Sequence, residues 1–421
     1  MTDAETAPAS PDETLDRGSL FFLEAFDPAN LVDPYPLYAR TRATDPILDG
    51  ENNLWFTFTH GAAHGLLRSR KVSSDERRGT FFQQSLADGT LPGHVTEREP
   101  FMLFLDPPDH DRLRGLVNKA FTQRRVDAMV KRIAARTDAL LSAEAFDGGP
   151  VDIIEHLAYP LPVAVICEML GVPESDHVQF GAWSDVMTKS VDPAVLRTEE
   201  DERAIASAAA ELDNYIAALA AARRAAPTDD LLSALLSARD GEDQLSEREL
   251  ISLVVLLLIA GHETTVNLIG NGTVALLRNQ EQLARWQADP TLAKSATDEL
   301  LRYDSPVQFA MRIMLEETEI EGALVPPGDQ VIVLLGAANR DPAMFEDPDR
   351  LDLGRSNAAR HLSFGGGIHH CLGMALARIE GQIALGSLVS RFRTLTLAEE
   401  PPIRDRMVLR GYDRILVELG R

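Results

Sequence analysis

A glycine-rich segment that ends in a cysteine constrains this chain more than any other feature. Residues 364–373 read Phe-Gly-Gly-Gly-Ile-His-His-Cys-Leu-Gly, and an apolar-periodic stretch from Leu372 to Phe392 follows. The periodicity predicts a helix that begins close to Cys371. A thiol at a helix N-terminus lies at the positive end of the helix dipole, which favours the thiolate. The glycines leave room for a large, flat group to approach the backbone.

Other interpretations of this segment are weaker. A phosphate-binding loop would need a Lys-Ser/Thr pair after the glycines, and the chain has none there. A zinc site built on His369, His370 and Cys371 would need a second Cys or His pair at finger spacing, which is also missing. Cys371 could still be an ordinary core thiol. A thiolate ligand to a haem iron is the interpretation that explains most of the positions.

The segment resembles the cysteine loop of the cytochrome P450 family, whose fixed positions match Phe364, Gly367, His369, Cys371 and Gly373. The resemblance implies haem b as the cofactor and Cys371 as the axial ligand of its iron. It also implies cofactor contacts from neighbouring residues of the loop, namely Phe364, Gly365, His369 and Gly373. The resemblance to this family extends from about Pro28 to the C-terminus.

A second motif lies inside a long apolar helix pattern. Leu253–Ile259 is continuously apolar and is followed by Ala-Gly-His-Glu-Thr-Thr at 260–265. Polar groups inside a buried helix are costly unless they have partners or a function. The motif resembles the oxygen-binding motif of the same family, which implies that Thr264 donates a hydrogen bond to bound O2 and that Glu263 relays protons. No role is assigned to His262.

A third motif is architectural. Glu299 and Arg302 are three residues apart, so they share a helix face. Such a pair is usually an exposed ion pair of little energetic consequence. Its position matches the Glu-x-x-Arg motif of the family, and the resemblance implies a buried network of Glu299, Arg302 and Arg350 that holds the cysteine loop.

Two carboxylates on a haem require cationic or hydrogen-bonding partners. Asp-Pro-Pro-Asp-His-Asp-Arg-Leu-Arg at 106–114 resembles the family segment that meets a propionate. It places His110 and Arg114 four residues apart on one helix face. By the same resemblance Arg312 and His361 are expected to contact the propionates, and His369 to join them.

Helical periodicity dominates the chain, and strand-like runs are short. The helical stretches are 126–141, 200–224, 247–278 and 372–392, and the strand-like runs are 54–59, 318–321 and 330–335, with the turn Pro326-Pro327-Gly328 between the last two. We therefore expect a mainly α (α+β) fold, which the resemblance identifies as a cytochrome P450-like helical prism with small antiparallel β-sheets. Residues 1–17 are expected to be a disordered tail, and residues 18–421 a single domain.

Composition limits the kinds of partner and the cellular compartment that we expect for this protein. The net charge of −24 argues against nucleic acid. Two cysteines cannot form a disulfide framework and fit a reducing, cytoplasmic compartment. The N-terminus lacks the pattern of a signal peptide, and the run from Leu253 to Ala260 is too short to span a bilayer, so no membrane anchor is expected.

One stretch of this acidic chain is basic, and Asp127 is the only acidic residue within it. Its cationic residues are Arg112, Arg114, Lys119, Arg124, Arg125, Lys131, Arg132 and Arg136. It is either a solvated helix face or a docking patch for an acidic, ferredoxin-type electron donor, and the resemblance favours docking.

The resemblance implies a haem-thiolate monooxygenase, expected to be a monomer, that inserts one oxygen atom of O2 into a lipophilic small molecule by hydroxylation or epoxidation. The expected lining of its site is largely apolar: Leu253, Leu257, Ala260, Val307, Phe309, Ala310, Met407 and Val408. The alternatives are a peroxide-driven peroxygenase and a non-catalytic, Cys-ligated haem sensor or binding protein, neither of which needs Glu263 and Thr264.

Overall fold

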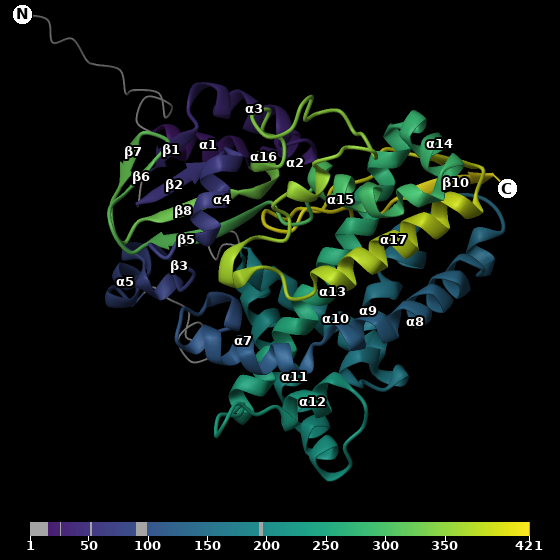
Figure 1. The fold of residues 1–421 in the computed structure, drawn as a ribbon, viewed down its shortest axis with the longest axis horizontal. Helices are drawn as coiled ribbons and strands as arrows, with labels where there is room; N and C mark the ends of the chain where they lie inside the picture. Colours follow the sequence, from purple (N-terminus) through teal and green to yellow (C-terminus); the bar gives the residue numbers. More distant parts are fainter. Residues whose placement is uncertain (1–15, 26, 51–52, 90–98, 193–196, 421) are drawn as a thin grey trace, which may run out of the picture.

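The chain folds into a helical body with the five-stranded and two-stranded β-sheets at one side and a three-stranded sheet near the C-terminus (Figure 1). The computed structural model describes residues 16–25, 27–50, 53–89, 99–192 and 197–420. Within these ranges the helices are α1 Arg17–Ala25, α2 Pro28–Val32, α3 Tyr35–Thr44, α4 His60–Arg68, α5 Thr80–Ala87, α7 Asp109–Ala120, α8 Gln123–Leu141, α9 Pro160–Leu170, α10 His177–Thr188, α11 Glu199–Ala225, α12 Leu231–Ser237, α13 Glu247–Arg278, α14 Gln280–Ala288, α15 Ala293–Tyr303, α16 Leu335–Ala338 and α17 Met374–Arg391. The predicted mainly helical fold with small sheets is confirmed.

The strands form a five-stranded, a three-stranded and a two-stranded sheet. They are β1 Ile47–Gly50, β2 Leu54–Thr57, β3 Val72–Ser73, β4 Val151–Asp152, β5 Phe309–Met314, β6 Thr318–Ile320, β7 Ala323–Val325, β8 Gln330–Leu334, β9 Thr394–Leu397 and β10 Leu416–Gly420. The largest sheet has the order β1-β2-β8-β5-β3, in which β2 and β8 are parallel and the other pairs antiparallel. The turn at 326–328 does not join two paired strands, because β6 pairs with β7 and β8 pairs with β2 and β5.

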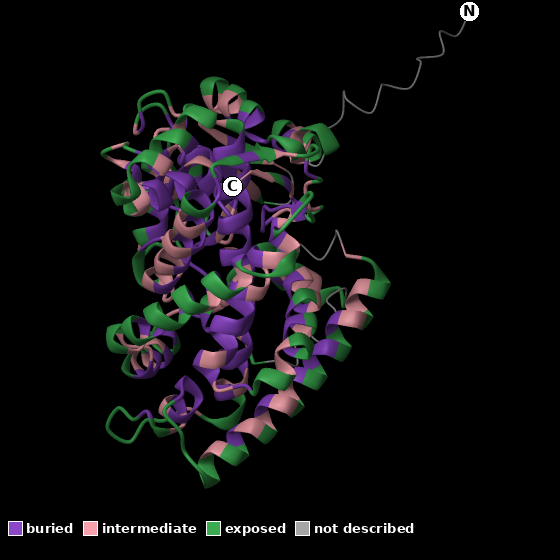
Figure 2. Cartoon of the chain, turned by 90° about the vertical axis from the view of Figure 1, so that its right-hand side faces the viewer, coloured by how far each residue is buried: buried purple, intermediate pink, exposed green. Residues whose placement is uncertain are grey.

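Helix α13 is the central element of the helical body. A capping box formed by Ser246 and Glu249 starts it, because each side chain satisfies the other residue's free backbone N–H. Most of its residues are buried, and Figure 2 shows that the buried faces of the helices turn toward the interior. By length and composition α13 is the one helix among the described residues that could cross a membrane, but 78% of its most apolar window is buried inside the protein. Its apolar character is therefore that of a core helix.

Helix α17, which follows the cysteine segment, packs closely on α13. A Cβ atom on Gly381 would lie 2.9 Å from Leu268 Cδ2 on α13 and 3.1 Å from Thr297 Cγ2 on α15. Glycine therefore permits a close approach of the two helices. This packing fixes the helix whose N-terminus carries Cys371 against the helix that carries Thr264.

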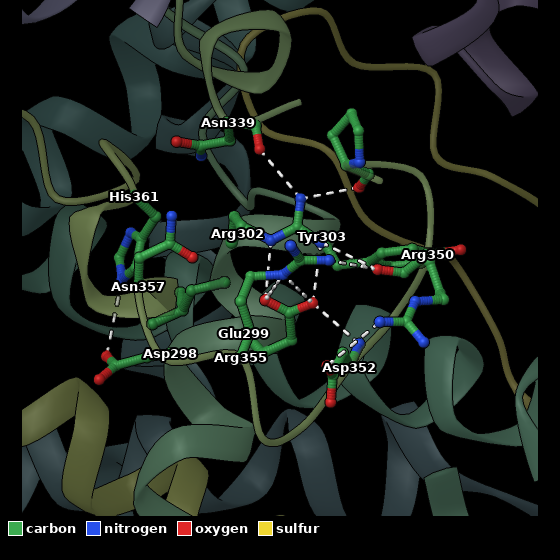
Figure 3. Close-up of polar contacts among 12 residues, drawn as sticks. Asp298, Glu299, Arg302, Tyr303, Asn339, Arg350, Asp352, Arg355, Asn357 and His361 are labelled. Carbon is green, nitrogen blue, oxygen red and sulfur yellow. Dashed lines mark hydrogen bonds and ion pairs between the residues drawn. The ribbon is translucent and has the colours of Figure 1, made fainter. Parts of the chain in front are cut away.

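The Glu299 network exists, but one of its expected members is wrong. Arg302 donates two hydrogen bonds to the fully buried Glu299 carboxylate, at 2.7 and 2.8 Å. The third partner is Arg355, whose Nε lies 3.1 Å from both carboxylate oxygens, and not Arg350 (Figure 3). The side chain of Arg350 is 66% exposed and faces Asp352, whereas that of Arg355 is only 7% exposed.

The physical reason is the course of the loop around 346–355. Carbonyl oxygens of Glu346, Asp347 and Arg350 accept hydrogen bonds from Arg355, so the loop wraps around this guanidinium and turns it inward. Arg350 contributes to the network only through its backbone carbonyl, which is also 3.3 Å from Arg302 Nη2.

Backbone contacts join this network to the start of the cysteine segment. Arg302 Nη1 donates to the carbonyl of Asn339, 3.0 Å away, and the Asn339 side chain accepts from the N–H of Leu362 and donates to Ser363 Oγ. Ser363 Oγ in turn donates to the carbonyl of Leu301 on α15. The buried ion cluster thus anchors the residues that lead into Phe364.

The predicted disordered tail lies almost wholly outside the described residues, which begin at Asp16, and α1 already includes Arg17. The single-domain interpretation of residues 18–421 stays a prediction.

Candidate functional site

Cys371 sits at the end of a tight loop that leads into α17. Its backbone N–H donates to the carbonyl of Phe364, 2.9 Å away, and closes the loop. Gly365 and Gly367 have φ of 67° and 66°, a region that favours glycine. A Cβ atom on Gly367 would also collide with the carbonyl oxygen of Leu67 on α4. The loop therefore requires glycine at the position that the sequence motif specifies.

The environment of the Cys371 sulfur combines burial with hydrogen-bond donors. Burial raises the pKa of the thiol, while the backbone N–H groups of Gly373 and Met374 and the charge of Arg114 act in the opposite direction. These N–H groups belong to the first turn of α17, where no carbonyl is available to them. They stabilise a thiolate at this place. Gly373 itself has open space at its Cβ position, with no atom within 4 Å.

Cationic and imidazole side chains gather beside this loop. Arg312 on β5 is buried, and among the described residues its Nη1 donates only to the neighbouring Met311 carbonyl. Burial lowers its pKa to about 10. Arg114 on α7 donates to the carbonyl of His370 at 2.8 Å, and burial lowers its pKa too.

The two imidazoles of the group are close to each other, because the rings of His110 and His369 are 4.4 Å apart. Burial of the His369 ring is the main reason why its pKa falls to about 3. The charges of His110, Arg312 and Arg114 lower this pKa further. The structure thus brings together four of the five expected propionate contacts. Among the described residues, no carboxylate forms an ion pair with either arginine of this group, although a buried guanidinium without an anion is costly.

These features fit a flat dicarboxylate cofactor such as haem. The arginines would receive the carboxylates, the sulfur of Cys371 would face the metal, and the free space at Gly373 would admit the ring.

His361 has other neighbours than these four residues, and its expected contact with a propionate stays a prediction. Its Nδ1 accepts the N–H of Ser363 at 3.1 Å, and its Nε2 faces Asp298 at 3.6 Å. Arg378 donates to the same carboxylate at 2.7 Å and lies over the ring of Phe364. A buried carboxylate attracts this histidine, and the pair supports the cysteine loop from the side of α15.

The expected oxygen-binding segment interrupts the burial of α13. Ala260 is exposed and Thr264 partly so, although the residues on the other faces of the helix are buried. Ala260 and Thr264 are four residues apart and share one face. Thr264 Oγ1 donates to the Ala260 carbonyl at 2.8 Å, and Thr265 Oγ1 lies 3.4 Å from the Gly261 carbonyl. Back-bonding of this kind loosens a helix locally.

Glu263 is buried and points to a different side of α13. Its Oε1 is ion-paired with Arg404, which also donates to Asp413 at 3.2 Å and to the carbonyl of Tyr412 at 3.2 Å. The carboxylate is thus held by a residue from the C-terminal part of the chain. Sequence reasoning missed Arg404, Arg355 and Asp298, because no motif surrounds them and their partners are far away in the sequence.

Comparison with known proteins agrees with this geometry. The family model described as cytochrome P450 matches residues 77–418. Cytochrome P450 107B1 of Saccharopolyspora erythraea is 42% identical over 94% of this chain and 98% of that protein. The vitamin D(3) 25-hydroxylase of Pseudonocardia autotrophica is 41% identical over 92% of this chain and 94% of that protein. The crystal structure of ligand-free CYP164A2 of Mycobacterium smegmatis superposes with a TM-score of 0.86 and 40% identity, over 94% of this chain and 99% of that one.

With its cysteine loop, its cationic group and similarity along almost its whole length, the chain belongs to the cytochrome P450 family and is a P450 monooxygenase.

Proposed function

We propose that this enzyme uses haem b and electrons from a separate ferredoxin and ferredoxin reductase to hydroxylate or epoxidise a lipophilic small molecule. For hydroxylation the balance is RH + O2 + 2 e⁻ + 2 H⁺ → ROH + H2O. The observation that carries the proposal is the Cys371 thiol, with the N–H groups of Gly373 and Met374 directed at it.

Haem, when bound, supplies an iron that binds and activates O2. Cys371 would bind its iron through the thiolate, and Phe364, Gly365 and Gly373 would help to hold the cofactor. Arg114, Arg312, His110 and His369 would hold its carboxylates, which provide the anions that the two arginines lack among the described residues.

Two side chains of α13 would donate or transfer protons during the reaction. The hydroxyl of Thr264 can turn from the Ala260 carbonyl toward the exposed face of the helix and donate there. Glu263 would take up a proton and pass it on, after its carboxylate releases Arg404. Arg404 has alternative acceptors in Asp413 and the Tyr412 carbonyl, so this release does not leave it unpaired.

The substrate is proposed to be lipophilic because the partly exposed residues near α13 and β5 are apolar. Leu257, Val307 and Ala310 are only partly buried, although each lies within or beside a buried element. Phe309, which alternates with Ala310 along β5, faces the other side of the sheet and lines a different pocket beside α1 and α3, so it is not part of this surface. Apolar surfaces of this kind favour apolar ligands. The vitamin D(3) 25-hydroxylase among the relatives acts on a ligand of that chemistry by its name.

The electron donor is proposed to be acidic and to dock near α8. Among the described cations of the basic stretch, most are already paired within the protein, for example Arg136 with Glu168 and Glu174. Arg124, Lys131 and Arg132 are exposed and have no ion-pair partner in the part of the chain that the structure describes. Helix α8 packs against α17, which begins just after Cys371, so this patch adjoins the proximal side of the site. We also propose a monomeric, cytoplasmic enzyme.

The alternatives are not favoured. A peroxygenase receives its protons with the peroxide and a sensor needs none, so neither accounts for a buried Glu263 beside Thr264 on the interrupted helix.

The first test is a titration of the purified ferric enzyme with lipophilic compounds, read at the Soret band. A shift toward the high-spin position identifies a compound that displaces water from the iron. Cys371→Ser is the matched control, since it keeps size and shape but removes the thiolate. Normal thiolate spectra and activity in that variant would refute the proposal.

A further inference from the structure

Three potential metal ligands converge between α10 and α13, on the side of α13 that Thr264 does not occupy. They are Asp185, His262 and Glu263, whose ligand atoms all lie within 4.8 Å of one another. His262 Nε2 is 3.5 Å from Asp185 Oδ1 and 3.8 Å from Glu263 Oε2. The proposed chemistry does not use His262.

In each of the three side chains, one polar atom already has a partner outside this group. His262 Nδ1 is 3.1 Å from the Leu258 carbonyl and 3.1 Å from Ser184 Oγ. Asp185 Oδ2 accepts from the hydroxyl of Tyr159 at 2.9 Å. Glu263 Oε1 is ion-paired with Arg404. These contacts orient the three side chains and leave one atom of each for the space between them.

The tautomer of His262 follows from its neighbour. A carbonyl oxygen only accepts, so Nδ1 carries the hydrogen and Nε2 of the neutral ring presents a lone pair. The side chain is 0% exposed, and Nε2 has no hydrogen-bond partner among the described residues. A buried lone pair therefore faces two carboxylate oxygens, an arrangement of three acceptors that calls for a cation between them.

The distances favour a metal ion over a shared proton. Separations of 3.5 and 3.8 Å exceed the range of about 2.7–3.2 Å for a sound hydrogen bond. Two ligands of a tetrahedral zinc ion with bonds of about 2.0–2.1 Å are roughly 3.3 Å apart. Small side-chain movements would bring all three atoms to that spacing.

We propose that Asp185, His262 and Glu263 form a binding site for a divalent transition metal of the Zn²⁺ type, with water in the fourth position. The ligand set of one imidazole and two carboxylates suits such an ion. The Asp185 side chain is 47% exposed, which gives the ion a path from solvent.

The site has a consequence for catalysis, which rests on the role proposed above for Glu263. A bound ion would hold Oε2 while Arg404 holds Oε1, so the carboxylate could no longer move protons. Zn²⁺ would then inhibit O2-driven turnover, and a chelator would restore it.

The test uses untagged holoenzyme titrated with ZnCl2 in a non-coordinating buffer by calorimetry, and crystals soaked with Zn²⁺ and measured at its absorption edge. We expect one strong site, an anomalous peak between the three side chains, and at least a 10-fold loss of affinity in both His262→Gln and Asp185→Asn. The matched control is His156→Gln, because His156 Nε2 lies 3.9 Å from Glu155 and no third ligand joins this pair among the described residues. The Zn²⁺ affinity of the His156→Gln variant should equal that of the unaltered protein.

An anomalous peak only elsewhere, or undiminished Zn²⁺ affinity in Asp185→Asn, would overturn the site. If His262→Gln fails to incorporate haem, Asp185→Asn decides alone. Binding at the site without inhibition would support the metal site and would contradict the role of Glu263, so the two proposals can fail separately.

Discussion

At the scale of single residues, Thr264 and Thr265 offer a matched pair. Both hydroxyls lie near the carbonyl four residues earlier, but Thr265 is buried, whereas Thr264 is on the exposed face of α13. We expect Thr264→Ala to keep consuming reductant while product formed per electron pair falls about 10-fold and hydrogen peroxide accumulates, because a proton donor is lost. Reductant oxidation, peroxide and product are measured together.

Thr264→Ser should retain most of the coupling, since it keeps the hydroxyl, and Thr265→Ala should resemble the unaltered enzyme. Equal product yield in Thr264→Ala would contradict the proton role and favour a peroxygenase.

Glu380 on α17 is a buried carboxyl that no motif indicated. It is 1% exposed, its Oε2 has no hydrogen-bond partner among the described residues, and burial raises its pKa from 4.5 to about 8. Between these values the folded protein holds a proton that the unfolded chain has released, so stability falls as pH rises through this window and levels off above it.

Glu380→Gln removes this dependence. We expect its thermal midpoint to match the unaltered protein near pH 5 and to exceed it at pH 8.5, by the equivalent of a few kcal/mol at most. Scans of Soret loss at one heating rate measure this. Glu281→Gln, at an exposed position of α14, controls for the loss of a surface charge. Parallel pH profiles for Glu380→Gln and the unaltered protein would refute a buried, protonated Glu380.

At the scale of elements, the loop of residues 346–355 decides how firmly the cysteine loop is anchored. Arg355→Ala would leave the buried Glu299 with one guanidinium instead of two, which should cost about 3 kcal/mol and lower the thermal midpoint by several degrees. Arg350→Ala removes only an exposed pair with Asp352 and should change the midpoint little. A larger effect of Arg350→Ala than of Arg355→Ala would contradict the arrangement in Figure 3.

The same loop shows where sequence reasoning stopped. Hydrophobic periodicity predicted α13 with its observed bounds, because that signal is local. Glu299 and Arg302 were recognised for the same reason, since they are one turn apart. The choice between Arg350 and Arg355 depends on how a loop folds over its own carbonyls, and local spacing does not contain that information.

Long-range pairs were equally hidden. Arg404 reaches Glu263 across 141 residues, Asp185 of α10 faces His262, and the hydroxyl of Tyr159 donates to Asp185. Each side chain is unremarkable in its own segment. The motif located Glu263 and Thr264 on one helix, but only the fold reveals that Arg404 holds the Glu263 carboxylate.

At the scale of the whole molecule, a net charge of −24 and an acidic partner would repel each other, so docking depends on a local excess of cations. Arg124, Lys131 and Arg132 supply it on α8, which packs against α17, the helix that follows Cys371. We expect Lys131→Glu combined with Arg132→Glu to slow reduction by an acidic ferredoxin about 10-fold at low salt, measured by stopped-flow absorbance.

The size of this effect should depend on ionic strength. Screening shortens the reach of charge to about 3 Å at 1 M salt, so the rates of the variant and the unaltered enzyme should converge there. Arg203→Glu is the control, because Arg203 is equally exposed but lies on α11, which packs against α10 and α13 instead of α17. Reduction by dithionite should be the same in all three proteins. If Arg203→Glu slows the ferredoxin reaction as much as the double variant, total charge and not the α8 surface governs the encounter.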